Sequence, residues 1–114
     1  MQMTGTEKQL TFATKIVEAV QSTDIDKLGR DQKKLLTAYR EAFAAAEQIK
    51  GGDKDAAQTR YSKLDDETAG MFVSILEKLS PKRDIAALVG HDVDAGRLID
   101  TAKGFFYGTL SKHV

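Results

Sequence analysis

Two long stretches of helical period dominate the hydrophobic pattern of the chain, and the pair Gly51-Gly52 separates them. Upstream, residues recur every three or four positions at Leu35, Tyr39, Ala42, Phe43, Ala46 and Ile49. Downstream, the same spacing recurs at Ala57, Tyr61, Leu64, Thr68, Met71, Ile75 and Leu79. This spacing places each set on one face of a helix. Because glycine ends a helix and lets the chain reverse, the pattern predicts an antiparallel helical hairpin.

The second helix of this hairpin is predicted to be unusually long. The first helix spans about 31–50, and the second starts at Asp53 or Lys54 and reaches Leu79. Such a length exceeds the mean of about 11–12 residues for helices in globular proteins. We therefore expect either Asp65-Asp66 or Gly70 to bend or split it.

Three further helical segments are predicted outside the hairpin. The first covers 6–21, and Thr4 with Glu7 fits a capping box at its start. A short helix at 81–89 follows Ser80-Pro81, and a last helix capped by Asp92 or Asp94 runs to 111. No alternating stretch indicates a β-strand. The fold class is therefore all-α.

We predict a single domain over residues 1–114, built as a compact bundle of four main helices plus one short helix. The antiparallel hairpin forms its spine, and the first and last helices pack on the apolar face of the hairpin. The 41% of apolar residues and 30% of charged residues are ordinary for a folded protein.

Charge and cysteine content exclude several classes of function. The 17 basic and 17 acidic residues give zero net charge, whereas a nucleic-acid binder usually carries a basic excess. With no cysteine, disulfides and thiolate metal sites are ruled out. Lys15 and Glu18 interrupt the only apolar stretch near the start, so no signal peptide is expected. The longest uncharged stretches are too short to span a membrane, so no membrane segment is expected. A cytoplasmic location follows as the default.

The last helix holds the clearest candidate surface. Phe105, Phe106 and Tyr107 are consecutive and span about 200° of a helix, which is wider than one core-facing stripe. Gly104 and Gly108 lie four residues apart and leave room for another helix. The predicted partner or dimer interface is Gly96, Lys103, Gly104, Phe106, Tyr107, Gly108 and Leu110. The alternative is that this helix is central in the core and surrounded by its own neighbours.

Residues 84–104 can also be read as a degenerate helix-turn-helix. Ala86 and Gly90 have the spacing of the small residue and the turn glycine in that motif. Arg97 and Lys103 would then be the nucleic-acid contacts. Gly96 falls where the motif has an apolar residue, however, and Asp92 and Asp94 would repel phosphates at the start of the recognition helix.

The segment from Gly52 to Ala57, followed by Tyr61, resembles the turn and second-helix start of a tetratricopeptide unit. In such a unit the aromatic fills the groove between two helices. The preceding helix has Ala45 where that family has glycine, and no second copy occurs, although arrays of this kind need about three repeats. We interpret the segment as hairpin chemistry.

No residue set predicts catalysis, a metal or a cofactor. His91, Asp92 and Asp94 are the densest group of possible ligands, but carboxylates two residues apart at a helix start are more typical of caps. We therefore expect no enzyme activity. The predicted function is a small protein–protein interaction or regulatory module, with another protein or a second copy of the chain as its partner.

Overall fold

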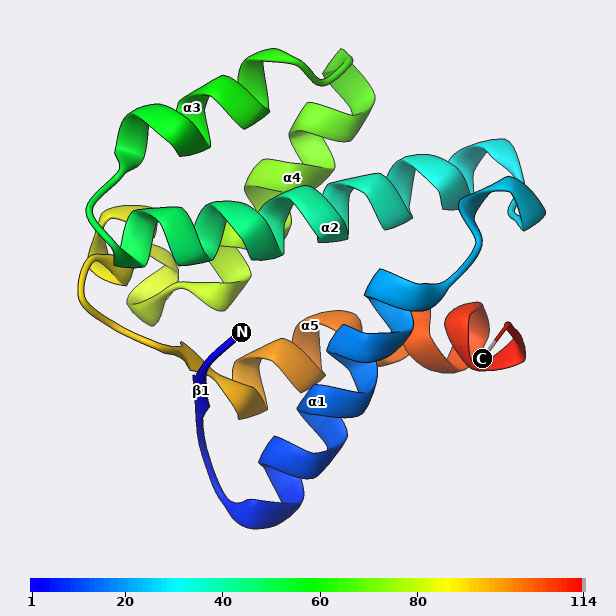
Figure 1. Cartoon of the computed structure of the whole chain (residues 1–114), viewed down its shortest axis with the longest axis horizontal. Helices are drawn as coiled ribbons and strands as arrows, with labels where there is room; N and C mark the ends of the chain where they lie inside the picture. The colour runs from blue at the N-terminus through cyan, green and yellow to red at the C-terminus, as the bar shows by residue number, and fades with distance from the viewer. Residues whose placement is uncertain (114) are drawn as a thin grey trace.

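The computed structural model describes residues 1–113, and helix α2 (Arg30–Lys50) crosses the middle of the molecule (Figure 1). Helices α3 (Lys54–Ser62) and α4 (Asp66–Leu79) both pack against α2. Helices α1 (Glu7–Ser22) and α5 (Ala95–Gly108) form a second pair, with α1 touching α2 and α5 touching α4. The expected all-α bundle around a hairpin is confirmed.

The glycine pair ends α2 as predicted. Gly51 is the C-cap, and Gly52 has a φ of 86°, a conformation that glycine adopts without steric cost. The side chain of Asp53 then accepts a hydrogen bond from the backbone N–H of Ala56 and starts α3. The chain therefore reverses within three residues and returns along α2.

The second helix of the hairpin is split in two, at one of the two predicted places. Helix α3 ends at Ser62, and Asp65 caps α4 by accepting hydrogen bonds from the N–H and the hydroxyl of Thr68, at 2.9 and 3.1 Å. Gly70 lies inside α4 and does not interrupt it. This cap stabilises α4, because its carboxylate accepts hydrogen bonds from N–H groups that have no partner within the first turn of a helix.

Two expected boundaries need correction. The capping box of α1 is formed by Thr6 and Gln9 instead of Thr4 and Glu7, because Thr4 lies in a strand. The segment expected as one helix at 81–89 consists of two 3-10 turns, η2 (Pro81–Arg83) and η3 (Ile85–Leu88). An α-helix cannot continue through Lys82 and Arg83, since both residues have positive φ angles.

Further 3-10 turns lie at Ile25–Lys27 (η1), after α1, and at Leu110–Lys112 (η4). The last helix was expected to reach 111, but α5 ends at Gly108 and η4 follows it.

The expectation of no strands is also corrected. Strand β1 (Met3–Thr4) pairs in parallel with β2 (Val93–Asp94), which brings the N-terminal segment to the start of α5. The ammonium of Lys50 supports this junction, because it contacts the Asp92 carboxylate and donates to the amide oxygen of Gln2 at 3.0 Å.

One continuous hydrophobic core joins all five α-helices. Its largest fully buried side chains include Phe43, Ile16, Leu36, Leu79, Leu88, Leu98 and Leu110. Tyr39 of α2 stacks on Phe105 of α5 at 5.4 Å between ring centroids and donates to the carbonyl of Thr101. Over residues 1–113, no helix is both long and apolar enough to cross a bilayer.

Candidate functional site

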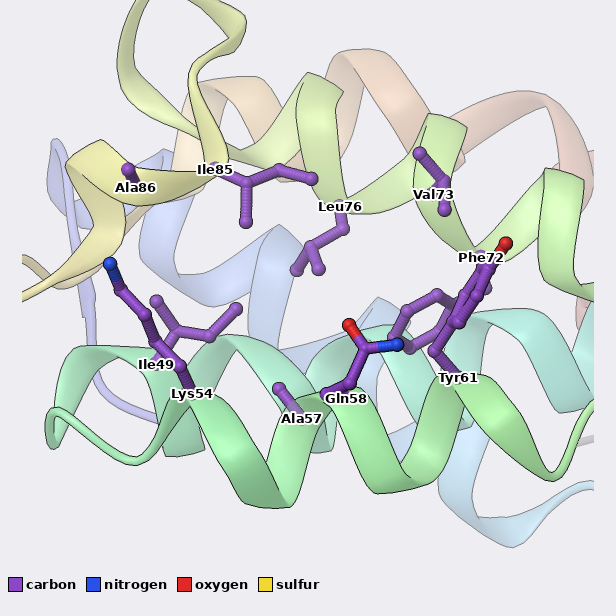
Figure 2. Close-up of a pocket in the computed structure, with 10 residues that line it drawn as sticks. All are labelled: Ile49, Lys54, Ala57, Gln58, Tyr61, Phe72, Val73, Leu76, Ile85 and Ala86. Carbon is purple, nitrogen blue, oxygen red and sulfur yellow. The ribbon is translucent and has the colours of Figure 1, made fainter.

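A cleft of about 360 Å³ opens between α3 and α4 (Figure 2). Helix α3 and the end of α2 form one wall, and α4 and the turn η3 form the other. The lining residues are Ile49, Lys54, Ala57, Gln58, Tyr61, Phe72, Val73, Leu76, Ile85 and Ala86. A cavity of this size, with apolar walls and few polar groups, is the usual form of a binding site.

The cleft has a buried apolar floor and a more exposed rim. Ile49, Phe72 and Leu76 belong to the hydrophobic core and supply the floor. At one end Tyr61, which is 40% exposed, lies beside Phe72 with 6.2 Å between ring centroids. At the other end Lys54 faces Ala86 across the opening (Figure 2). The cleft is therefore closed by aromatic rings at one end and bordered by an ammonium group at the other.

The cleft is open because α3 has too few apolar residues to fill it. Ala57 is the only buried residue of α3. The helix is held to α2 by Arg60, which donates to Glu41 at 2.7 Å and to Gln48 at 2.9 Å. Helix α3 therefore packs against α2, and the apolar face of α4 across the cleft stays partly uncovered.

The caps of α3 and α4 set the position of both walls. Asp53 starts α3, and Asp65 starts α4 after the short connection that follows Ser62. The hydrogen bond from the Thr68 N–H to the Asp65 carboxylate is the main cause that lowers the pKa of Asp65. This carboxylate is therefore a stable cap at neutral pH.

The lining of the cleft contains few polar side chains. Three polar side chains border the cleft, those of Lys54, Gln58 and Tyr61, and the lining includes no carboxylate, histidine, serine or threonine. Within residues 1–113, Lys54 has no carboxylate within 4.0 Å. In the same range, no group of three potential ligands from histidine, cysteine, aspartate and glutamate is placed to hold a metal ion.

The structure divides the predicted interface of the last helix between core and surface. Phe106 and Leu110 are 3% and 0% exposed, so their side chains belong to the core of this chain and offer almost no surface to a partner. This burial is a correction, and its cause is the packing of α5 on α1 and α4.

The remaining predicted residues lie on or near the surface. Tyr107 is 63% exposed, and its ring lies 5.7 Å from that of Phe12. Lys103, Gly104 and Gly108 are also exposed. A Cβ at either of these glycines would meet no atom within 4 Å, whereas one at Gly96 would meet Gln9 of α1 at 3.1 Å. Gly96 is thus explained by packing, and Gly104 and Gly108 are not.

Residues 84–104 do not form a helix-turn-helix. The expected first helix is the four-residue 3-10 turn η3, and strand β2 lies where the motif has its turn. Arg97 and Lys103 are six residues apart on α5, and Lys103 lies 4.0 Å from Asp100. Arg97 instead lines a hollow with Lys78 and Arg83.

The acidic residues before α5 have structural partners. Asp94 caps α5 by accepting from the Arg97 N–H, and the hydrogen bond to Asp92 raises the pKa of Lys50. The ring of His91 forms a hydrogen bond with the carbonyl oxygen of Val89. These contacts account for the group that the sequence offered as possible metal ligands.

Sequence reasoning missed the cleft, although it named five of its lining residues, which are Ile49, Lys54, Ala57, Tyr61 and Ala86. The helical spacing places Ala57 and Tyr61 in one apolar row of the hairpin. The available signal was the polar composition of residues 54–63, which contain few large apolar side chains. A helix that follows a turn but lacks an apolar face cannot cover its neighbour.

Comparisons with protein-family models, with curated proteins and with solved structures give no match.

Proposed function

We propose that the chain is a non-catalytic, cytoplasmic module that binds another protein, and that the cleft between α3 and α4 receives an apolar segment of this partner. The supporting observation is the cleft itself. It exposes carbon surface that the core of the chain leaves uncovered, and its lining includes no histidine or carboxylate. Binding would then be the activity, as in an adaptor or a regulator.

An amphipathic helix is the occupant that matches the walls of the cleft. Two helices border the opening, and a helix laid between them can insert apolar side chains above Ile49 and Leu76. Lys54 has no carboxylate within 4.0 Å in residues 1–113, so an acidic residue on the occupant would supply its partner. The proposed partner segment therefore combines large apolar residues with an acidic residue at one end.

Adjacent positions on α3 provide the test. Gln58 lines the cleft and Thr59 does not, and both are exposed. A tryptophan in Gln58→Trp would fill the opening, whereas the same residue in Thr59→Trp would project outside it. We expect proteins captured from the native host by the wild-type chain to be lost with Gln58→Trp and kept with Thr59→Trp. Equal capture by both variants would refute the cleft as the binding surface.

Self-association through α5 is a second candidate, supported by the exposed ring of Tyr107 between Gly104 and Gly108. Such glycines are costly within a helix unless a close neighbour uses the space. Light scattering after size-exclusion chromatography should then show a dimer of the wild type and a monomer of Tyr107→Glu. Val89→Glu, which changes an exposed apolar residue outside the helix, should remain dimeric. A monomeric wild type would eliminate this candidate.

A further inference from the structure

A second hollow, of about 280 Å³, gathers positive charge on a chain whose net charge is zero. It is lined by Lys78 from the last turn of α4, Arg83 from η2, and Arg97, Asp100 and Thr101 from α5. Three cations and one carboxylate leave the hollow with a formal charge of +2. The hollow shares no lining residue with the cleft between α3 and α4.

The fold leaves these three cations without partners in residues 1–113. None of them lies within 4.0 Å of a carboxylate, and none of their side chains donates a hydrogen bond to the protein in this range. The carboxylate of Asp100 is nearest to Lys103, at 4.0 Å. The donors of all three cations are therefore available to a ligand.

Two of the cations also occupy positions that are unfavourable in the free protein. Arg97 is in the first turn of α5, where the helix dipole places partial positive charge. Arg83 has a φ of 58° and follows Lys82 with a φ of 54°, a left-handed conformation that residues with a side chain rarely adopt. Strain of this kind is concentrated at functional sites, and a bound anion would offset the repulsion among the cations.

We propose that this hollow binds a phosphate group. Two guanidinium groups can each donate two parallel hydrogen bonds to phosphate oxygens, and the ammonium of Lys78 adds a point charge. A dianionic phosphate balances the formal charge of +2. The open hollow suits either the free anion or a phosphate carried by a larger ligand.

NMR titration of the full chain with inorganic phosphate, at constant ionic strength, tests the proposal. We expect saturable shifts in the backbone amides of residues 78, 83 and 97. Arg83→Gln and Arg97→Gln should each weaken binding at least about fivefold, because each removes a bidentate charged donor. Lys27→Gln and Lys112→Gln, which remove exposed cations elsewhere, should leave binding unchanged.

Lys82→Gly separates the charge of the hollow from its backbone strain. Glycine adopts a positive φ without cost, so this variant should be more stable than the wild type and still bind phosphate. Phenyl phosphate serves as a second probe: tighter binding than inorganic phosphate assigns the hollow to a phosphorylated ligand, and weaker binding assigns it to the free anion. Shifts that rise without saturation, or that persist in Arg83→Gln and Arg97→Gln with circular dichroism unchanged, would overturn the site.

Discussion

Arg60 of α3 donates a hydrogen bond to Glu41 of α2 across 2.7 Å, and this ion pair holds α3 beside α2. The same guanidinium also donates to Gln48, so two contacts fix the side chain. Helix α3 itself buries only Ala57. The position of the cleft wall therefore depends on polar contacts from one arginine more than on hydrophobic packing.

Removing this arginine should loosen α3 without unfolding the molecule. In Arg60→Ala we expect faster amide hydrogen exchange over Lys54–Ser62 and unchanged exchange in α1 and α5. The side chains of Arg60 and Glu41 are about one-third exposed, so the free energy of unfolding should decrease by about 1 kcal/mol or less. Arg30→Ala, which breaks the exposed 3.9 Å pair with Glu67, is the control. Equal protection of α3 in Arg60→Ala and wild type would contradict the role of the pair.

The cleft should bind a small apolar anion that imitates one end of its occupant. Anilinonaphthalene sulfonate combines aromatic rings with a negative charge and fluoresces in apolar surroundings. We expect Lys54→Glu to weaken binding of the dye about fivefold, because the substitution replaces the ammonium at the rim with a carboxylate that repels the sulfonate of the dye. Lys63→Glu reverses an exposed charge just beyond α3 and should have little effect. Similar affinities for both variants would show that the dye binds elsewhere.

Asp65 makes the start of α4 sensitive to acid. Its pKa lies below the ordinary value of 3.8, chiefly because the Thr68 N–H donates to the ionised form. A lowered pKa in the folded state gives stability that is present above pH 3.8 and is lost as the pH falls through the folded pKa. Asp65→Asn keeps a capping oxygen but does not titrate. The free energy of unfolding, measured with denaturant at about pH 6 and at about pH 2, should decrease less for this variant than for the wild type.

Lys50 gives an opposite dependence at alkaline pH. The hydrogen bond to Asp92 raises its pKa above 10.5, so its stabilising contribution is complete below that value and is lost as the pH rises through the folded pKa. Burial raises the pKa of Tyr39 as well, and stability therefore also falls as the pH rises past the ordinary value of 10.0. Asp92→Asn should remove the contribution of Lys50 to this pH dependence and leave the contribution of Tyr39. Unfolding curves at about pH 9 and about pH 11 should differ less for this variant than for the wild type.

The sequence predicted those parts of the fold that local chemistry controls. Gly51-Gly52 and the apolar rows around it were sufficient for the hairpin, and the carboxylates at 65 and 66 marked one of the two places where its second helix could divide. Ser80-Pro81 suggested a helix, but Lys82 and Arg83 take positive φ angles that their residue types do not announce. The pairing of β1 with β2 joins residues about ninety positions apart, and two-residue strands leave no periodic signal.

The candidate sites could be predicted only in part, because each of them depends on how helices are placed relative to one another. The three consecutive aromatics of α5 correctly indicated that one ring reaches the surface, and the structure identifies it as Tyr107. The pattern could not show that Phe106 and Leu110 face α1 and the core. The cleft and the basic hollow combine residues from helices and turns that are distant in the chain, so periodicity within one helix does not reveal them.

Position-specific photo-crosslinking in the native host tests the central proposal most directly. A photoreactive residue at position 58 lies in the cleft, whereas one at position 59 lies outside it and borders a different hollow. We predict a crosslinked product between this chain and another protein from position 58, and none from position 59. The product from position 58 should disappear when Lys54→Glu is added. Crosslinking that is equal from the two positions, or absent from position 58, would contradict the assignment of the cleft between α3 and α4 as the partner-binding site.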